Sequence, residues 1–210
     1  MYKWENKEKV MDKNKKIFYF FIGLTLIIGV LMLNKIHKQN KYKNEWNSIN
    51  VEDKEVIESV IKLAEEKIGL EYVWGGKGEI MTEERLDELI GYYTDEYYPL
   101  DRDDYMGKQA FDCSGLTHWI YKEVTGVNIG YSTYEQEDVL QGYEVNKKDI
   151  RPGDLVYTPG HVVLYIGDGK IINAYNKYAY PVGGVKYGKL QLKKDSVIYR
   201  PTEYIDSLNN

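Results

Sequence analysis

The chain has 210 residues, with 28 Lys and Arg against 33 Asp and Glu, a formal net charge of −5, and one cysteine. A single cysteine excludes an intrachain disulfide framework and any zinc or iron–sulfur site built from several cysteines. The mildly acidic total argues against a general nucleic-acid-binding protein, which would need a basic domain. The hydrophobic content of 43% is that of a globular protein.

The net charge is an average over unlike regions. Residues 1–43 hold 10 Lys and only 3 acidic residues, whereas residues 79–104 hold 10 acidic residues and 2 Arg. The sequence therefore joins a basic N-terminal part to a domain with one strongly acidic segment.

An uncharged apolar stretch runs from Ile17 to Leu33 and is closed by Asn34 and Lys35. As a helix it would be about 26 Å long, near the lower limit for crossing a bilayer. A buried core helix would rarely be uncharged on every face, and a cleaved signal peptide should end in small residues, which are absent here. We therefore predict a transmembrane signal anchor over residues 17–36, with a cytoplasmic basic segment at 1–16 and a stalk at 37–50.

The flanking lysines predict the orientation of this anchor. Six lysines precede the apolar stretch and four follow it, up to Lys43. The positive-inside bias then favours a cytoplasmic N-terminus and an extracytoplasmic C-terminal domain in a single-pass protein of the cell membrane. The lipid bilayer is accordingly one expected partner.

Residues 51–210 have the length of one domain. Apolar spacing predicts helices over 51–68, over 82–90 with Gly91 as its end, and over 113–124 ending near Gly126. A short strand is predicted at 70–74, and later strands at 155–157, 161–166, 170–175 and 196–200. Helices followed by an antiparallel meander predict an α+β fold.

Cys113 stands at the first turn of a predicted helix. The N–H groups and positive end of the helix lower a thiol's pKa and can bind an oxyanion, although a free cysteine is more often a small buried hydrophobe. Of the three histidines, His37 lies in the predicted stalk, and His118 lies about 500° further round the Cys113 helix. His161, at the start of a strand, is therefore the candidate base.

A third group should orient the imidazole of His161. If Gly167-Asp168-Gly169 is a three-residue hairpin loop, Ile166 pairs with Lys170, and Asn173 lies diagonally across from His161 on the same face. A two-residue turn would shift the register by one and separate the two side chains. The role of Asn173 therefore depends on the register of this hairpin.

Five sequence blocks together resemble one family. They are Tyr72-Val73-Trp74-Gly75-Gly76, Phe111-Asp112-Cys113-Ser114-Gly115-Leu116, Arg151-Pro152-Gly153-Asp154-Leu155-Val156, Gly160-His161-Val162-Val163-Leu164-Tyr165-Ile166-Gly167 and Ile171-Ile172-Asn173-Ala174. In this order they resemble the NlpC-type cell-wall cysteine peptidases. The resemblance implies a papain-like domain, with helices packed on an antiparallel sheet, that cleaves peptidoglycan stem peptides, commonly after γ-D-glutamate.

The resemblance also implies residue roles. Cys113 is then the nucleophile, His161 the base and Asn173 the third polar member, a position where the family more often has His. Tyr72 matches a tyrosine near the catalytic cysteine, while Asp112 and Ser114 match substrate-site residues that bind a terminal amine in members acting on free stem peptides. No metal or cofactor is implied. An amidase or acyltransferase on the same fold, or a non-catalytic wall-binding protein with an occluded site, are the alternatives.

The connection between the first two blocks is much longer than the family pattern. This acidic, tyrosine-rich insertion at about 77–110 contains Tyr92, Tyr93, Tyr97, Tyr98 and Tyr105. Two interpretations remain open, an ordered flap beside the cleft or a solvated surface insertion.

Overall fold

The structure is a computed structural model that describes residues 2–209, with the side chains of residues 2–14, 41 and 42 outside the description. It divides into two compact units at Asn44 and Glu45. The lysines of residues 3 to 13, which support the predicted orientation of the anchor, thus lie outside the described side chains.

The first helix, α1 (Tyr2–Asn47), contains the apolar stretch. Its candidate membrane span, Lys15–Asn47, has a mean hydropathy of 2.3 and none of its most apolar part is buried. Within it, the Thr25 hydroxyl donates to the carbonyls of Phe21 and Ile22, so this hydroxyl is satisfied inside the helix. The helix passes Ile36 without a break, so the lysine-rich segment expected as a stalk is helical to Asn47.

The first helix that lies wholly in the second unit is α2 (Val51–Glu65), where the Asn50 side chain accepts from the N–H of Asp53. The strand expected over 70–74 is not formed. Instead Tyr72 makes a single parallel bridge to Phe111, because Gly75, with φ of 75°, turns the chain directly afterwards.

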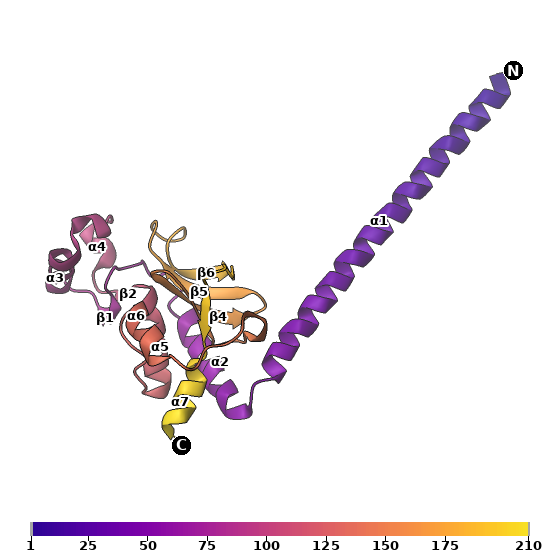
Figure 1. The fold of residues 1–210 in the computed structure, drawn as a ribbon. Coiled ribbons are helices and arrows are strands. Elements are labelled where there is room, and N and C mark those ends of the chain that lie inside the picture. Colours follow the sequence, from indigo (N-terminus) through magenta and orange to yellow (C-terminus); the bar gives the residue numbers. More distant parts are fainter. Residues whose placement is uncertain (1, 210) are drawn as a thin grey trace. The chain divides into compact units, whose positions relative to one another are not determined.

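Residues 77–110 form a small subdomain whose two ends pair with each other (Figure 1). Its elements in order are β1 (Lys77–Ile80), α3 (Glu83–Tyr93), η1 (Asp95–Tyr97), α4 (Arg102–Tyr105) and β2 (Gln109–Phe111). α3 continues past Gly91, because a helical glycine costs only about 1 kcal/mol and Tyr93 beyond it contacts Trp74. A separate apolar core, centred on Leu86 and Leu89, holds the subdomain together.

The remaining helices and the main sheet follow. The helices are α5 (Cys113–Thr125), α6 (Thr133–Val139), η2 (Lys147–Asp149) and α7 (Pro201–Asn209). The strands are β3 (Leu155–Thr158), β4 (His161–Gly167), β5 (Lys170–Tyr175), β6 (Gly184–Lys189) and β7 (Val197–Tyr199). They form one antiparallel sheet in the order β6-β5-β4-β3-β7, which confirms the predicted α+β class. β6 was not predicted.

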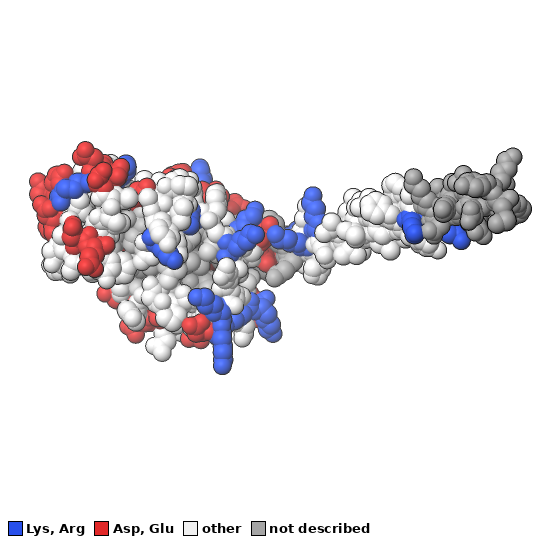
Figure 2. Space-filling model, turned by 90° about the horizontal axis from the view of Figure 1, so that it is seen from above, with Lys and Arg blue, Asp and Glu red and all other residues white. Residues whose placement is uncertain are grey.

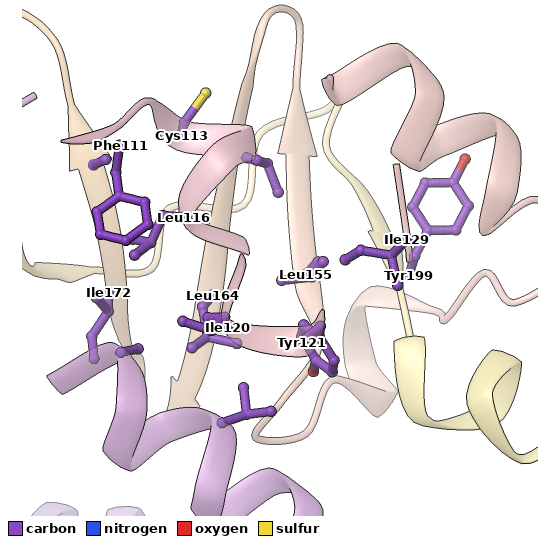
Figure 3. Packing of buried hydrophobic residues seen from close by; sticks show 14 of the residues in the cluster. Phe111, Cys113, Leu116, Ile120, Tyr121, Ile129, Leu155, Leu164, Ile172 and Tyr199 are labelled. Carbon is purple, nitrogen blue, oxygen red and sulfur yellow. The ribbon is translucent and has the colours of Figure 1, made fainter. Parts of the chain in front are cut away.

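The main core lies between α5 and this sheet. Figure 3 shows Leu116 and Ile120 of α5 directed toward Leu164 of β4 and Ile172 of β5. α5 ends at Gly126, as predicted, because Gly126 has a φ of 74° and adopts the left-handed conformation of a helix C-cap. One face of the sheet thereby fixes the helix that begins at Cys113.

The β4–β5 hairpin has a shorter loop than predicted, but His161 and Asn173 still lie on the same face of the sheet. Gly167 pairs with Lys170, so the loop has two residues, Asp168 and Gly169, both with positive φ. The predicted pairing of Ile166 with Lys170 is therefore wrong. A bulge at Ile166 adds one residue to β4 and shifts the register of the rest of the strand by one. Leu164 therefore pairs with Ile172, which is the pairing that a three-residue loop without a bulge would have produced.

The Arg151-Pro152-Gly153-Asp154 block is structural. Arg151 Nη2 lies 2.7 Å from Asp53 Oδ2 of α2, and Arg200 Nε lies 2.9 Å from Asp154 Oδ1. The Tyr121 hydroxyl of α5 donates to the carbonyl of Gly153. These buried contacts hold the turn before β3 against two helices.

Candidate active site

α5 begins at the residue that the sequence singled out. Asp112 is its N-cap, and the Asp112 carboxylate accepts from the backbone N–H of Gly115 at 2.6 Å. Cys113 is the first helical residue, and Figure 3 shows its sulfur directed away from Leu116 and the core below. The cap therefore fixes where the chain turns and where the thiol points.

The Cys113 thiol lies against the start of β4. It is 7% exposed and accepts hydrogen bonds from the backbone N–H groups of Val162 and Ser114. Burial, followed by the charge of Asp112, raises the pKa of the thiol, while Lys77 and the two N–H groups lower it less. The expected lowering by the helix N-terminus is thus outweighed by desolvation.

His161 and Asn173 lie on neighbouring strands, and their side chains are hydrogen-bonded to each other. Burial lowers the pKa of His161, the bond to Asn173 raises it less, and Lys193 lowers it slightly. Asn173 Nδ2 donates to the carbonyl of Lys186 at 3.4 Å, so its side-chain oxygen faces the imidazole N–H. The bulge at Ile166 is what makes this contact possible.

Tyr72 lies close to Cys113. A hydrogen bond joins its hydroxyl to the backbone N–H of Cys113, and burial together with the charges of Cys113 and Asp112 raises the hydroxyl's pKa well above its usual value. The hydroxyl therefore stays protonated and can donate to an oxygen that arrives beside the thiol.

Asp112 and Ser114 are joined by a residue that sequence reasoning missed. Lys77 Nζ lies 2.5 Å from Asp112 Oδ2 and 3.1 Å from Ser114 Oγ, and Ser114 Oγ lies 3.0 Å from Asp112 Oδ1. Lys77 is 35 positions before Asp112, and no local pattern links the two. The pairing of β1 with β2 brings them together.

A second missed residue is Gln136 of α6, which is fully buried beneath the start of α5. Its amide nitrogen donates to the carbonyls of Ser114 at 2.8 Å and Gly130 at 3.1 Å. Its amide oxygen accepts from the hydroxyls of Thr117 at 3.1 Å and Tyr157 at 2.8 Å. All four hydrogen-bonding positions of this side chain are therefore used to hold α5 against α6 and β3.

His118 is not brought to the thiol. It is 2% exposed, its ring lies 4.3 Å from that of Tyr131, and burial lowers its pKa. His37 lies on the exposed surface of α1. Among the described residues, no group of three or more His, Cys, Asp or Glu is arranged to hold a metal ion.

The insertion is ordered and lies beside Tyr72. Trp74 contacts the ring of Tyr97 at 4.6 Å, and the Tyr98 hydroxyl donates to the Trp74 carbonyl at 3.0 Å. An open hollow with about 290 Å³ of empty space is bordered by the insertion, by Tyr72 and by Tyr178 of the β5–β6 connection. Figure 2 shows acidic side chains gathered over the end of the unit that carries α3 and α4. These contacts favour the ordered flap over a solvated insertion.

Part of the chain is similar in sequence to known proteins. Murein DD-endopeptidase MepS/Murein LD-carboxypeptidase of Escherichia coli K12 is 36% identical over 72 residues, which are 32% of this chain and 37% of that protein. A probable endopeptidase of Corynebacterium glutamicum is 42% identical over 73 residues, 33% of this chain and 34% of that protein. The chain thus spans about a third of the length of these relatives.

The fold has a counterpart among solved structures. The peptidoglycan hydrolase RipB from Mycobacterium tuberculosis matches with a TM-score of 0.50 and 25% identity, over 73% of this chain and 69% of that one. The sequence profile of the NlpC/P60 family matches residues 69–186, which include every site residue named above. Because this match covers more than half of the 210 residues, the protein belongs to the NlpC/P60 family and has its papain-like α+β fold.

Proposed function

We propose that this protein is a cysteine endopeptidase that hydrolyses peptide bonds in peptidoglycan stem peptides, after γ-D-glutamate, through Cys113, His161 and Asn173. The observation that carries the proposal is the position of the thiol against the start of the strand that carries His161. The thiol lies at a helix N-terminus against the backbone of Val162, the residue that follows His161, and the imidazole of His161 is bonded to Asn173. The names of the relatives support the reaction class.

The chemistry follows the acyl-transfer pattern. The His161 imidazole takes the thiol proton, and the Cys113 sulfur attacks the amide carbon to form a tetrahedral oxyanion. The hydroxyl of Tyr72 and the N–H of Cys113, which would exchange the Tyr72 oxygen for the oxyanion, are the donors proposed for it. His161 then gives its proton to the leaving amine as the carbon–nitrogen bond breaks, and next activates water, which cleaves the thioester and regenerates the thiol.

The resting state of this site is proposed to be neutral. The pKa of the Cys113 thiol is raised and that of the His161 imidazole is lowered, both mainly by burial. A thiolate–imidazolium pair is therefore disfavoured before substrate binds. In this mechanism His161 acts as a general base during attack, and Asn173 keeps its ring in the orientation that attack requires.

The decisive experiment compares the full-length chain with its Cys113→Ala variant on defined muropeptides, with products identified by mass spectrometry. We expect a cut within the stem by the wild type and none by Cys113→Ala. His37→Ala, an exposed histidine of α1, is the matched control and should cleave normally. Cleavage that survives in Cys113→Ala would sink the proposal. A cut at the sugar junction, or transfer of an acyl group, would replace it with an amidase or an acyltransferase.

We also propose that α1 anchors the protein in the cell membrane as a single-pass helix, with the NlpC/P60 domain extracytoplasmic. The apolar, uncovered surface of Lys15–Asn47 supports this. The full-length chain should stay with membranes through alkaline carbonate washing, and external protease should digest the domain in intact protoplasts. Release by carbonate, or protection from protease, contradicts the anchor or its orientation respectively.

A further inference from the structure

Lys77 is placed beside the nucleophile by backbone pairing. It is the first residue of β1, lies opposite Phe111 of β2, and therefore stands next to Asp112 and Cys113 at the end of the ladder. The Gln109 side chain donates to the Gly78 carbonyl at 2.9 Å, and the Lys77 N–H donates to Glu79 Oε2 at 2.6 Å. The two ends of the insertion are thus joined by hydrogen bonds next to Lys77.

The Lys77 ammonium forms an ion pair with the carboxylate of Asp112. The two side chains are about 26% and 12% exposed, so their ion pair lies at the edge of the site and is partly desolvated. Two of the three ammonium protons are directed at Asp112 and Ser114, which leaves one proton for a ligand. Lys77 also acts on the charge of Cys113, which places it within electrostatic range of the reacting thiol.

This arrangement would treat the two forms of an amino end placed beside Asp112 differently. A free ammonium beside Asp112 would have to displace Lys77 or remain next to a like charge. A neutral acylated amine would instead offer a carbonyl oxygen to the remaining Lys77 proton. In peptidoglycan the amino end of the stem is acylated while the stem is attached to its sugar, and it becomes an ammonium when the stem is released.

We propose that Lys77 is a specificity-determining residue that makes the site select stem peptides with an acylated amino end over released stems with a free ammonium. The inference rests on the proposed function and deepens it, since it assigns the substrate class to attached stems. It also gives the insertion a role, namely to supply an internal cation to Asp112.

The first test measures kcat/KM of the full-length chain on two synthetic stem peptides that differ only in a free or an N-acetylated amino end. We expect the wild type to prefer the acetylated peptide by about tenfold or more, the effect of one charged hydrogen bond. Lys77→Met should raise cleavage of the free-amine peptide about tenfold, and Asp112→Asn added to Lys77→Met should abolish that gain.

Two further variants serve as controls. Lys77→Arg should keep the wild-type preference. Lys108→Met, an exposed lysine of the same insertion, is the control.

The second test measures binding of the same two peptides to the Cys113→Ala variant by calorimetry, with and without Lys77→Met, so that it does not depend on turnover. Tighter binding of the acetylated peptide, lost in Lys77→Met, supports the inference. Equal affinities, no binding of either peptide, or a preference unaffected by Lys77→Met overturns it. If wild type and Cys113→Ala cleave alike, the proposed function itself fails; if cleavage needs Cys113 but ignores the amino end, only this inference fails.

Discussion

The carbonyl oxygen of Gly76 lies so close to Gly115 that a Cβ on Gly115 would stand 2.0 Å from it. The same oxygen accepts from the N–H of Asp112 at 3.0 Å, so the first turn of α5 is pressed directly onto the glycine pair that precedes the insertion. Only a glycine at 115 allows this approach, and the clash is with backbone, which cannot rotate away.

Gly115→Ala is therefore expected to lower the free energy of unfolding by about 2 kcal/mol or more and to reduce cleavage, because α5 must move off the Gly76 carbonyl. Chemical denaturation of the full-length chain in detergent measures this. Gly91→Ala is the matched control, because a Cβ there meets nothing within 4 Å and α3 should gain stability. Equal effects of the two variants would show that the close approach is unimportant.

Gln136→Glu is expected to destabilise the protein by about 2–5 kcal/mol. The substitution keeps the shape of the side chain but removes the two N–H donors that the carbonyls of Ser114 and Gly130 require. Gln141→Glu, at an exposed position in the turn after α6, should change the midpoint of denaturation very little. A similar midpoint for both variants would contradict the role given to Gln136.

The acid limb of kcat/KM is expected to lie below pH 6.5, since burial lowers the pKa of His161 and the imidazole must be neutral to accept the thiol proton. Asn173→Asp places a negative charge beside the imidazole and raises its pKa. The limb should then move to higher pH by about 1, so that activity at pH 6 falls relative to pH 8. Asn146→Asp, which is exposed, should leave the profile unchanged. A limb that does not move in Asn173→Asp argues against contact between these two groups in the working enzyme.

Asp112→Asn is expected to speed alkylation of Cys113 by iodoacetamide at pH 7 by about threefold to tenfold. After burial, the Asp112 charge is the largest cause of the raised thiol pKa, and its removal lowers that pKa. Asparagine retains an oxygen for the N–H of Gly115, so the helix cap survives. Asp104→Asn, on the exposed surface of the insertion, is the control. Unchanged or slower alkylation in Asp112→Asn would contradict this electrostatic account.

Elements with strong local signals could be predicted from the sequence. The helix over 113–124 was recognisable from its apolar spacing and from Gly126, and the structure ends it there because Gly126 tolerates a left-handed conformation. The positions of β3, β4 and β5 followed from alternation and turn residues, whereas the pairing of β7 with β3 was not predicted. β6 was missed because its Gly184 and Gly188 and its lysines resemble a loop, whereas pairing with β5 decides its conformation.

Features that depend on distant contacts were not predictable. The contact of His161 with Asn173 rests on a bulge at Ile166, and an extra residue in a strand has no local signature. Lys77 and Gln136 reach the first turn of α5 from far along the chain. The sign of the Cys113 pKa shift was also misjudged, because its burial is a property of the packed molecule.

The burial of Cys113 has a consequence for the chemical stability of its thiol. Peroxides and other oxidants attack the thiolate, and a cysteine that is 7% exposed with a raised pKa offers them little of it. The chain has no second cysteine with which a sulfenic acid at Cys113 could form an internal disulfide. In the function proposed above, a nucleophile that stays protonated until a substrate arrives would offer oxidants little thiolate, at some cost in reaction speed.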